Sequence, residues 1–202
     1  MPAHPIPLVA GFDEVGRGCI AGPVVAAAVV FPAEGDWTGL DLADSKLLSP
    51  KQRRQLTAAI ERCSVAWAIG RAEAPEIDRL NILHATLLAM RRAWEALPIK
   101  AHSALVDGNR YPKLPIPSRA VVGGDRTVPA ISAASILAKV FRDREMTVLD
   151  SLFPDFGFAA HKGYPTKFHQ AALQRLGPSP AHRRSFAPIK RLLIADSLFP
   201  PQ

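Results

Sequence analysis

Cysteine is scarce in this chain of 202 residues, and ligand spacing of the zinc-binding type is missing. The two cysteines, Cys19 and Cys63, form no CxxC pair, and the six histidines form no cluster at zinc-ligand spacing. The sequence therefore does not favour a structural zinc site. A reduced, intracellular environment is the simplest interpretation.

Long apolar runs are also missing. The most apolar stretch, Ile20 to Phe31, is shorter than the roughly 20 residues that a membrane-spanning helix needs. The opening residues, Met1 to Pro7, lack the basic start, unbroken apolar stretch and small-residue cleavage site of a secretory signal. We therefore expect a soluble, cytoplasmic protein that does not associate with a membrane.

Acidic residues are outnumbered by basic ones. The 18 Asp and Glu face 25 Lys and Arg, which leaves a net charge of +7 and a pI near 9.8. This balance favours a polyanionic partner, although many basic proteins bind no nucleic acid. With 48% hydrophobic residues the chain can bury one sizeable core, and a single domain is the default expectation at this length.

Residue periodicity predicts a mixture of strands and helices. Strands are expected at Leu8 to Asp13, Pro23 to Phe31, Val65 to Arg71, Ser103 to Val106 and Ala120 to Val122, with the first two forming a hairpin-like pair. Helices are expected from the capping Ser49-Pro50 to about Arg62, from Pro75 to Leu97, from Thr127 to about Leu149, and briefly after Pro165. A basic tail through Arg183, Arg184, Lys190 and Arg191 follows.

The predicted helix that starts at Thr127 carries a narrow polar stripe. Between Ala130 and Arg142 the non-apolar residues are Ser132, Ser135, Lys139 and Arg142, which are three, four and three residues apart. This spacing places them on one face of the helix. A helix that is apolar around most of its circumference is buried, so the stripe faces either solvent or a site, and we favour a site.

Two acids, Asp13 and Glu14, end the first predicted strand. Adjacent residues on a regular strand point to opposite faces, so both carboxylates reach one ion only if the strand bends or bulges there. The ordinary alternative is a solvated strand end followed by a turn. Residues 16–21 also match the G-x-G-x-x-A dinucleotide fingerprint. That motif must open a helix, whereas Gly22-Pro23 and a strand-like run follow here, which argues against it.

Asp107 and Asp125 each follow a predicted strand in a glycine-containing turn. Taken singly, each is explained as a turn or helix-capping residue. Together with Asp13 and Glu14 they form four acids at strand ends in a basic protein, and gathering like charges without a cation is unfavourable. Mg²⁺ or Mn²⁺ would remove this repulsion, because these hard cations prefer carboxylate and water oxygens.

Several short motifs follow one another along nearly the whole chain. They are Asp13-Glu14-Val15-Gly16-Arg17-Gly18 with Ala21-Gly22-Pro23-Val24, Asp44-Ser45-Lys46, Asp107-Gly108-Asn109, Gly124-Asp125, Ser135 to Lys139, and His161-Lys162-Gly163-Tyr164-Pro165. Each is weak alone, but the ordered set resembles the ribonuclease HII family. Val15 and the Cys19-Ile20 pair differ from the Ala and Pro-Leu expected there, and these neighbours do not change the four acids.

The resemblance implies an α/β fold, a ribonuclease H-like mixed β-sheet flanked by helices with a small helical C-terminal part. Residues 1–202 would form a single domain. Its catalytic core would span about 8–155, and a helical substrate-binding part would span about 156–202.

The resemblance also implies a reaction. Catalytic Asp13, Glu14, Asp107 and Asp125 would hold two divalent ions, Mn²⁺ or Mg²⁺, in an endonuclease that cuts the RNA strand of RNA–DNA hybrids. It would also cut 5′ of ribonucleotides embedded in duplex DNA, leaving 5′-phosphate and 3′-hydroxyl ends.

Substrate contacts are implied as well. Gly16, Arg17, Gly18 and Tyr164 would recognise the RNA-to-DNA junction, and Lys46, Ser135 and Lys139 would contact phosphates. A lone histidine such as His161 is not assigned as a base, because two ions make one dispensable.

Other interpretations stay open. A non-catalytic, basic nucleic-acid-binding protein would bind duplexes equally well without Mg²⁺. Ribonuclease HIII is a related enzyme with an additional N-terminal domain, for which the position of Asp13 leaves no room. We expect a monomer. The terminal Asp196 to Pro200 segment is either a docking peptide for a replication or repair protein or a frayed end.

Overall fold

A mixed five-stranded sheet forms the centre of the molecule. The computed structural model describes residues 7–34, 37, 40, 42 and 49–198. The strands are β1 (Leu8–Val15), β2 (Val24–Pro32), β3 (Ala66–Ala72), β4 (Ser103–Asp107) and β5 (Ser118–Val121). Their order is β3-β2-β1-β4-β5. The first three strands pair antiparallel, as the predicted hairpin requires, whereas β4 pairs parallel with β1 and β5 pairs parallel with β4.

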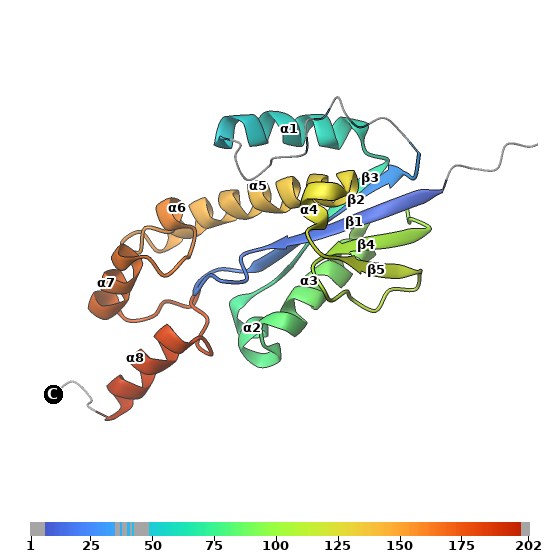
Figure 1. The fold of residues 1–202 in the computed structure, drawn as a ribbon. Coiled ribbons are helices and arrows are strands. Elements are labelled where there is room, and N and C mark those ends of the chain that lie inside the picture. Colours follow the sequence, from blue (N-terminus) through green and yellow to red (C-terminus); the bar gives the residue numbers. More distant parts are fainter. Residues whose placement is uncertain (1–6, 35–36, 38–39, 41, 43–48, 199–202) are drawn as a thin grey trace, which may run out of the picture.

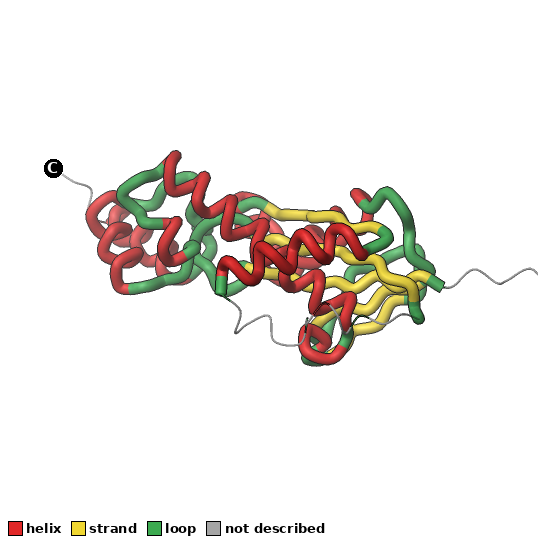
Figure 2. The backbone as a smooth tube through the Cα atoms, turned by 90° about the horizontal axis from the view of Figure 1, so that it is seen from above, coloured by secondary structure: helices red, strands yellow, loops and turns green. Residues whose placement is uncertain are grey.

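Helices cover both faces of this sheet (Figure 1). They are α1 (Pro50–Cys63), α2 (Ala74–Leu80), α3 (Ile82–Ala96), α4 (Gly124–Thr127), α5 (Pro129–Leu152), α6 (Phe158–His161), α7 (Lys167–Leu176) and α8 (Ala187–Leu198). Helix α3 packs on one face of β2 and β3, whereas α5 packs on the other face of β1 and β2 and carries α1 on its outer side. Figure 2 shows α5 and α1 lying over the strands from above. Among the described residues, no helix is long and apolar enough to cross a membrane.

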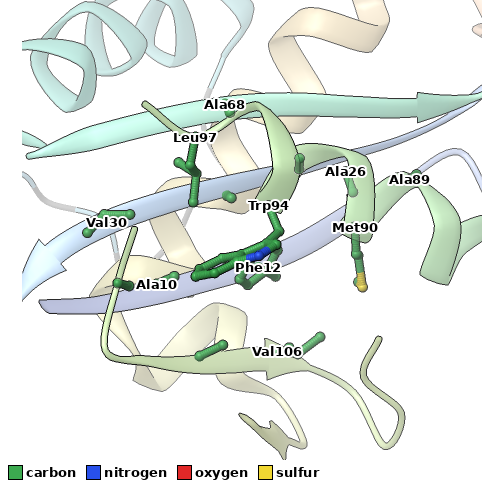
Figure 3. Packing of buried hydrophobic residues seen from close by; sticks show 14 of the residues in the cluster. Ala10, Phe12, Ala26, Val30, Ala68, Ala89, Met90, Trp94, Leu97 and Val106 are labelled. Atoms are coloured by element: carbon green, nitrogen blue, oxygen red, sulfur yellow. The ribbon is translucent and has the colours of Figure 1, made fainter. Parts of the chain in front are cut away.

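The face under α3 holds a large aromatic and aliphatic core. Phe12 of β1 and Val106 of β4 are fully buried there against Met90 and Trp94 of α3 (Figure 3). Such burial contributes about 1.5–3 kcal/mol per large side chain, so this core fixes how β1 and β4 pair. The strand residues that alternate with Phe12 and Val106 therefore face α5.

The face under α5 is also closely packed, because small residues line it. A Cβ added at Gly11 of β1 would lie only 2.1 Å from the backbone carbon of Ala130 in α5. Glycine is therefore required here for the start of α5 to touch the sheet. This contact brings the polar stripe of α5 close to the end of β1.

The helix expected from Pro75 to Leu97 is broken, so that prediction is wrong in the middle. Asn81 separates α2 from α3 with a positive φ of 67°. Its side-chain oxygen accepts a hydrogen bond from the backbone N–H of His84, which makes Asn81 the N-cap of α3. Its ψ of 166° lies outside the left-handed region that asparagine commonly adopts, but asparagine caps helices well, so the local capping chemistry overrides the apolar periodicity. By contrast, the predicted Ser49 cap of α1 is confirmed, since its hydroxyl accepts from the Gln52 N–H.

The helix expected from Thr127 to about Leu149 is confirmed as α5, which begins two residues later and ends at Leu152, and the short α4 precedes it. Val128 ends α4, and Pro129 at the first turn begins α5, as proline favours. The polar stripe lies wholly in α5, and its four residues differ in burial. Ser132 is buried and donates to the carbonyl of Asp125, and Arg142 is only 1% exposed. The expectation that the whole stripe faces solvent or a site is therefore wrong at its two ends.

The C-terminal part forms a third apolar cluster with the end of α5. Phe158 of α6, Leu173 of α7 and Ile189 of α8 are buried there with Met146. The expected small helical C-terminal part is confirmed by α6, α7 and α8, whereas the basic tail expected through Arg183, Arg184, Lys190 and Arg191 is wrong at its first residue. Arg183 is fully buried, and a helix, α8, continues through Leu198. Residues 199 and 200 of the expected docking segment lie outside the described residues.

Two histidines, His169 and His182, are joined inside this C-terminal part. Their Nε2 atoms are 2.9 Å apart, and both side chains are buried. His182 Nδ1 accepts from the Ser179 N–H, and His169 Nδ1 lies 2.9 Å from the Tyr164 carbonyl oxygen, to which it can only donate. A proton added to either ring would therefore remove an acceptor that this network uses, so both rings are uncharged. Burial lowers the pKa of each histidine to about 4.

We predict that this histidine pair makes the protein acid-sensitive. Unfolded histidine titrates near 6.5, so the unfolded chain binds more protons than the folded one between pH 6.5 and 4, and stability falls with falling pH across that window. The loss is on the order of 3 kcal/mol, measured as the free energy of unfolding in urea. His169→Gln should reduce this loss and His84→Gln, on the surface, should not. An equal pH dependence in all three proteins would contradict the prediction.

Candidate active site

The pairing of β1 with β4 places two aspartates side by side. The parallel register runs from Val9↔Ser103 to Phe12↔Val106, so the next residue on each strand is Asp13 and Asp107. Both are on the face opposite the Phe12 core because side chains alternate along a strand. Asp107 is also the last residue of β4, as the sequence predicts.

Asp125 joins them from the first turn of α4 rather than from a strand end. β5 stops at Val121, and Gly123 turns the chain with a φ of 67° before the helix begins. The backbone N–H of Asp125 donates to Oδ1 of Asp107, at 3.2 Å. This hydrogen bond ties the two acidic segments together.

Glu14 reaches the same place without the expected bulge. The pairing of β1 with β2 continues regularly through Asp13↔Ala27 and Glu14↔Ala26, so a bulge in this ladder is not observed. Asp13 therefore faces α5, and Glu14 starts on the α3 face. The β1–β4 ladder ends at Phe12, so Glu14 lies beyond it, and its side chain lines the same pocket as Asp13.

One pocket collects most of the predicted site. Its lining residues are Asp13, Glu14, Val15, Arg53, Asp107, Asp125, Ser135, Ile136, Lys139 and Tyr164. All four predicted acids are present, with three of the predicted substrate contacts. Ser135 and Lys139 come from the middle of the α5 stripe and line the same pocket as the four acids, and their role as substrate contacts stays a prediction. Lys139 forms an ion pair with Asp143, one turn further along α5, at 2.6 Å.

The glycine segment lies beside this pocket. Gly16 has a φ of 93°, and a Cβ at Gly18 would have only the Tyr164 ring within 4 Å, at 3.9 Å. The Arg17 guanidinium forms an ion pair with Glu14 at 3.0 Å. Lys46, the remaining predicted contact, lies outside the described residues.

Sequence reasoning missed one charged pocket residue, Arg53 of α1, and the apolar lining residues Val15 and Ile136. Arg53 shares a helix face with Thr57 and Ile60, which are buried. An arginine on the buried face of an amphipathic helix is the signal that could have identified it.

Two of the acids, Asp13 and Glu14, are poorly solvated. Burial raises the pKa of Asp13 to about 7, and the carboxylates of Glu14 and Asp107 raise it further, whereas a hydrogen bond with Ser135 opposes the shift. Burial also raises the pKa of Glu14, against the opposing effect of Arg17. In the described residues no three His, Cys, Asp or Glu side chains are gathered closely enough to form a ready-made metal site. The carboxylates share a pocket but stand apart within it.

Solved structures share this fold. Ribonuclease H2 from Pyrococcus horikoshii OT3 is 27% identical, with a TM-score of 0.76, over 93% of this chain and 98% of that one. The PCNA:RNase HII complex from Archaeoglobus fulgidus gives 25% identity and a TM-score of 0.68 over 87% and 93%. Bst-RNase HIII in complex with Mn²⁺ shares the fold at 17% identity and a TM-score of 0.67, over 94% of this chain and 70% of that one. The chain is thus a ribonuclease H-like nuclease.

The family follows from the sequence comparisons. The family model described as Ribonuclease HII matches residues 10–189. A ribonuclease HII from Methylococcus capsulatus is 59% identical over 190 residues, which is 94% of this chain and 97% of that protein. The chain belongs to the ribonuclease HII family. It is therefore a hydrolase, an endonuclease of the ribonuclease H type that acts on RNA–DNA hybrids.

We predict that Asp13→Asn stabilises the metal-free protein at pH 8. The folded pKa of Asp13, about 7, lies above the ordinary value of 3.8, so the folded state holds an extra proton between these values and loses stability as the pH rises through them. The variant carries no such charge, and it should gain at least about 1 kcal/mol in free energy of unfolding at pH 8.

The gain should shrink toward pH 4, where both proteins are uncharged at this position. Urea denaturation in the presence of a chelator measures it. A variant no more stable than the parent protein at pH 8 would show that the Asp13 carboxylate is well solvated.

Proposed function

We propose that this protein cuts the RNA strand of hybrids, and cuts 5′ of single ribonucleotides in duplex DNA, with two divalent ions held by Asp13, Glu14, Asp107 and Asp125. The observation that carries the proposal is the gathering of these four carboxylates in one pocket of a basic chain.

The donor set fits a hard divalent cation. Its oxygens are those that Mg²⁺ and Mn²⁺ prefer, and the poor solvation of ionised Asp13 leaves charge that a cation would compensate. Bound ions would supply an activated water and stabilise the leaving 3′ oxygen of an in-line displacement. The four acids would draw inward around them, and Ser135 would keep the Asp13 carboxylate oriented.

Recognition would come from the other pocket residues. Lys139 can exchange Asp143 for a phosphate, since the ion pair is partly exposed. The backbone of Gly16-Arg17-Gly18 would approach the ribose 2′-hydroxyl, the group that distinguishes RNA from DNA, and the exposed Tyr164 ring would pack on the neighbouring deoxyribose. The helical part from about residue 156 onward would support the duplex.

A replication partner is a further part of the proposal. The Archaeoglobus fulgidus protein was solved as a complex with PCNA, which supports a sliding clamp as a partner for this chain. The docking role of Asp196 to Pro200 stays a prediction, as does the monomeric state.

The decisive experiment uses a labelled DNA duplex with one embedded ribonucleotide, incubated with Mg²⁺, Mn²⁺ or a chelator. We expect metal-dependent cutting on the 5′ side of the ribonucleotide, and Asp125→Asn should reduce the rate at least about a hundredfold while leaving hybrid binding intact. If the protein cuts only long hybrids, the proposed cutting at single ribonucleotides is wrong. Full activity of both Asp13→Asn and Asp125→Asn would contradict the proposed four-carboxylate site. Binding without cutting in every condition would favour a non-catalytic role.

A second prediction separates recognition from folding. The space around Gly18 accepts a Cβ at ordinary contact distance, so Gly18→Ala should leave the melting temperature nearly unchanged. It should slow cutting at a single ribonucleotide about tenfold or more, because the added methyl group keeps the backbone from the 2′-hydroxyl. Tyr164→Ala, at an exposed ring, should behave likewise. Unchanged rates in both variants would contradict the junction role.

A further inference from the structure

The link between β1 and β2, residues 16–23, lies outside the five-stranded sheet. Several of its backbone groups are nevertheless hydrogen-bonded to other parts of the chain. The N–H of Ile20 donates to the Gly163 carbonyl, and the N–H of Gly22 donates to the Ala181 carbonyl, each at 2.9 Å. A buried backbone group without a partner is unfavourable, so the carbonyls of the link need donors as well.

Arg142 of α5 supplies several of these donors. Its Nε donates to the Pro23 carbonyl at 3.0 Å and its Nη2 to the Ala21 carbonyl at 3.1 Å. Its Nη1 donates at 2.8 Å to the carbonyl of Lys162, two residues before Tyr164. A single side chain thus joins the glycine link to the segment that carries Tyr164. A Cβ at Gly16 would lie 2.2 Å from Arg142 Nε, so the guanidinium lies directly on the link.

Arg183, in the C-terminal part, also donates hydrogen bonds to this link. Its Nε and Nη2 donate to the Gly22 carbonyl at 3.0 and 2.8 Å. Its Nη1 donates to the carbonyl of Arg17 at 3.1 Å, and its backbone N–H donates to that of Ile20 at 2.9 Å. Arg17 is the central residue of the Gly16-Arg17-Gly18 segment.

Burial of the Arg142 and Arg183 guanidinium groups is unfavourable by itself, because each loses its hydration. Both are almost completely buried, and no carboxylate in the described part of the chain hydrogen-bonds to either. Burial lowers the pKa of Arg183 to about 10, with the charge of Arg142 acting in the same direction. Two desolvated cations close together cost free energy that backbone carbonyls offset only in part.

The held link is in contact with Tyr164. The Cys19 thiol of the link is buried and hydrogen-bonded to the Tyr164 side chain. A Cβ at Gly163 would lie 2.5 Å from the Ala21 carbonyl oxygen, so the two segments touch through their backbones. Movement of the link would therefore move both recognition elements.

We propose that Arg142 and Arg183 are positioning residues for substrate discrimination, which hold the Gly16-Arg17-Gly18 backbone and Tyr164 at a fixed separation for the RNA-to-DNA junction. This inference rests on the proposed junction role of these segments. It assigns neither arginine to the chemistry, which belongs to the four carboxylates.

The test compares Arg142→Lys and Arg183→Lys with the parent protein on two substrates, a duplex with one ribonucleotide and a long RNA–DNA hybrid. Lysine keeps the charge and the stem but cannot bridge several carbonyls. We expect the ratio of single-ribonucleotide to hybrid kcat/KM to fall roughly tenfold to hundredfold, because a displacement of about 1 Å at a recognition group has effects of that size.

Hydrogen exchange supplies a readout that is independent of activity. The amides of Ile20 and Gly22 should exchange faster in both variants, while amides of β1 stay protected. Arg92→Lys is the matched control. Arg92 bridges Glu76 and the Arg71 carbonyl, and none of these three residues lines the pocket of the four acids. Its replacement should therefore lower stability without changing the substrate ratio.

Each outcome is decisive. Equal loss on both substrates, or protected link amides in both lysine variants, would overturn the positioning role. If one variant fails to fold, the other is judged alone, because the two arginines reach the link from different elements. A parent protein that cuts hybrids but not single ribonucleotides would instead refute the junction proposal, and exchange at Ile20 would still report whether the arginines hold the link.

Discussion

The parallel pairing of β1 with β4 is the constraint on which the site depends. Phe12 and Val106 are paired and buried under α3, and the residue after each is an aspartate on the opposite face. A slip of one residue would turn Asp107 into the apolar core, at a large cost in desolvation. The hydrophobic packing on one face of the sheet therefore enforces the gathering of like charges on the other.

Chemistry and discrimination are held by different parts of the fold. The carboxylates are carried by strands and by the first turn of α4, close to the central core. The proposed recognition elements are carried by a link and a loop, which gain order through side chains of α5 and of the C-terminal part. In the link, buried arginine side chains donate hydrogen bonds to backbone carbonyls, as paired strands do within the sheet.

The sequence predicted the elements that local patterns determine. The five strands, the Ser49 cap and the gathering of Asp13, Glu14, Asp107 and Asp125 in one pocket were all accessible from period, capping chemistry and motif order. The helix break at Asn81 was missed because apolar spacing continues across it. A capping asparagine within a long apolar pattern is the local feature that outweighs periodicity here.

Long-range contacts were beyond the reach of such patterns. The spacing of Arg142 matched that of Ser135 and Lys139, yet it is buried against carbonyls more than a hundred residues earlier in the chain. Arg183 resembled a solvated tail residue for the same reason. The sequence around an arginine does not show whether its guanidinium is hydrated or donates to a carbonyl far away in the chain.

The bonds from Arg183 to the carbonyls of Arg17 and Gly22 join the link after β1 to a residue synthesised more than 160 positions later. During synthesis, every strand and α5 leave the ribosome before Arg183 does, and domains begin to fold from the N-terminal side. A nascent chain therefore acquires its acidic pocket first and the brace on its glycine link last. Ordering of that link therefore depends on synthesis of the C-terminal part that carries Arg183.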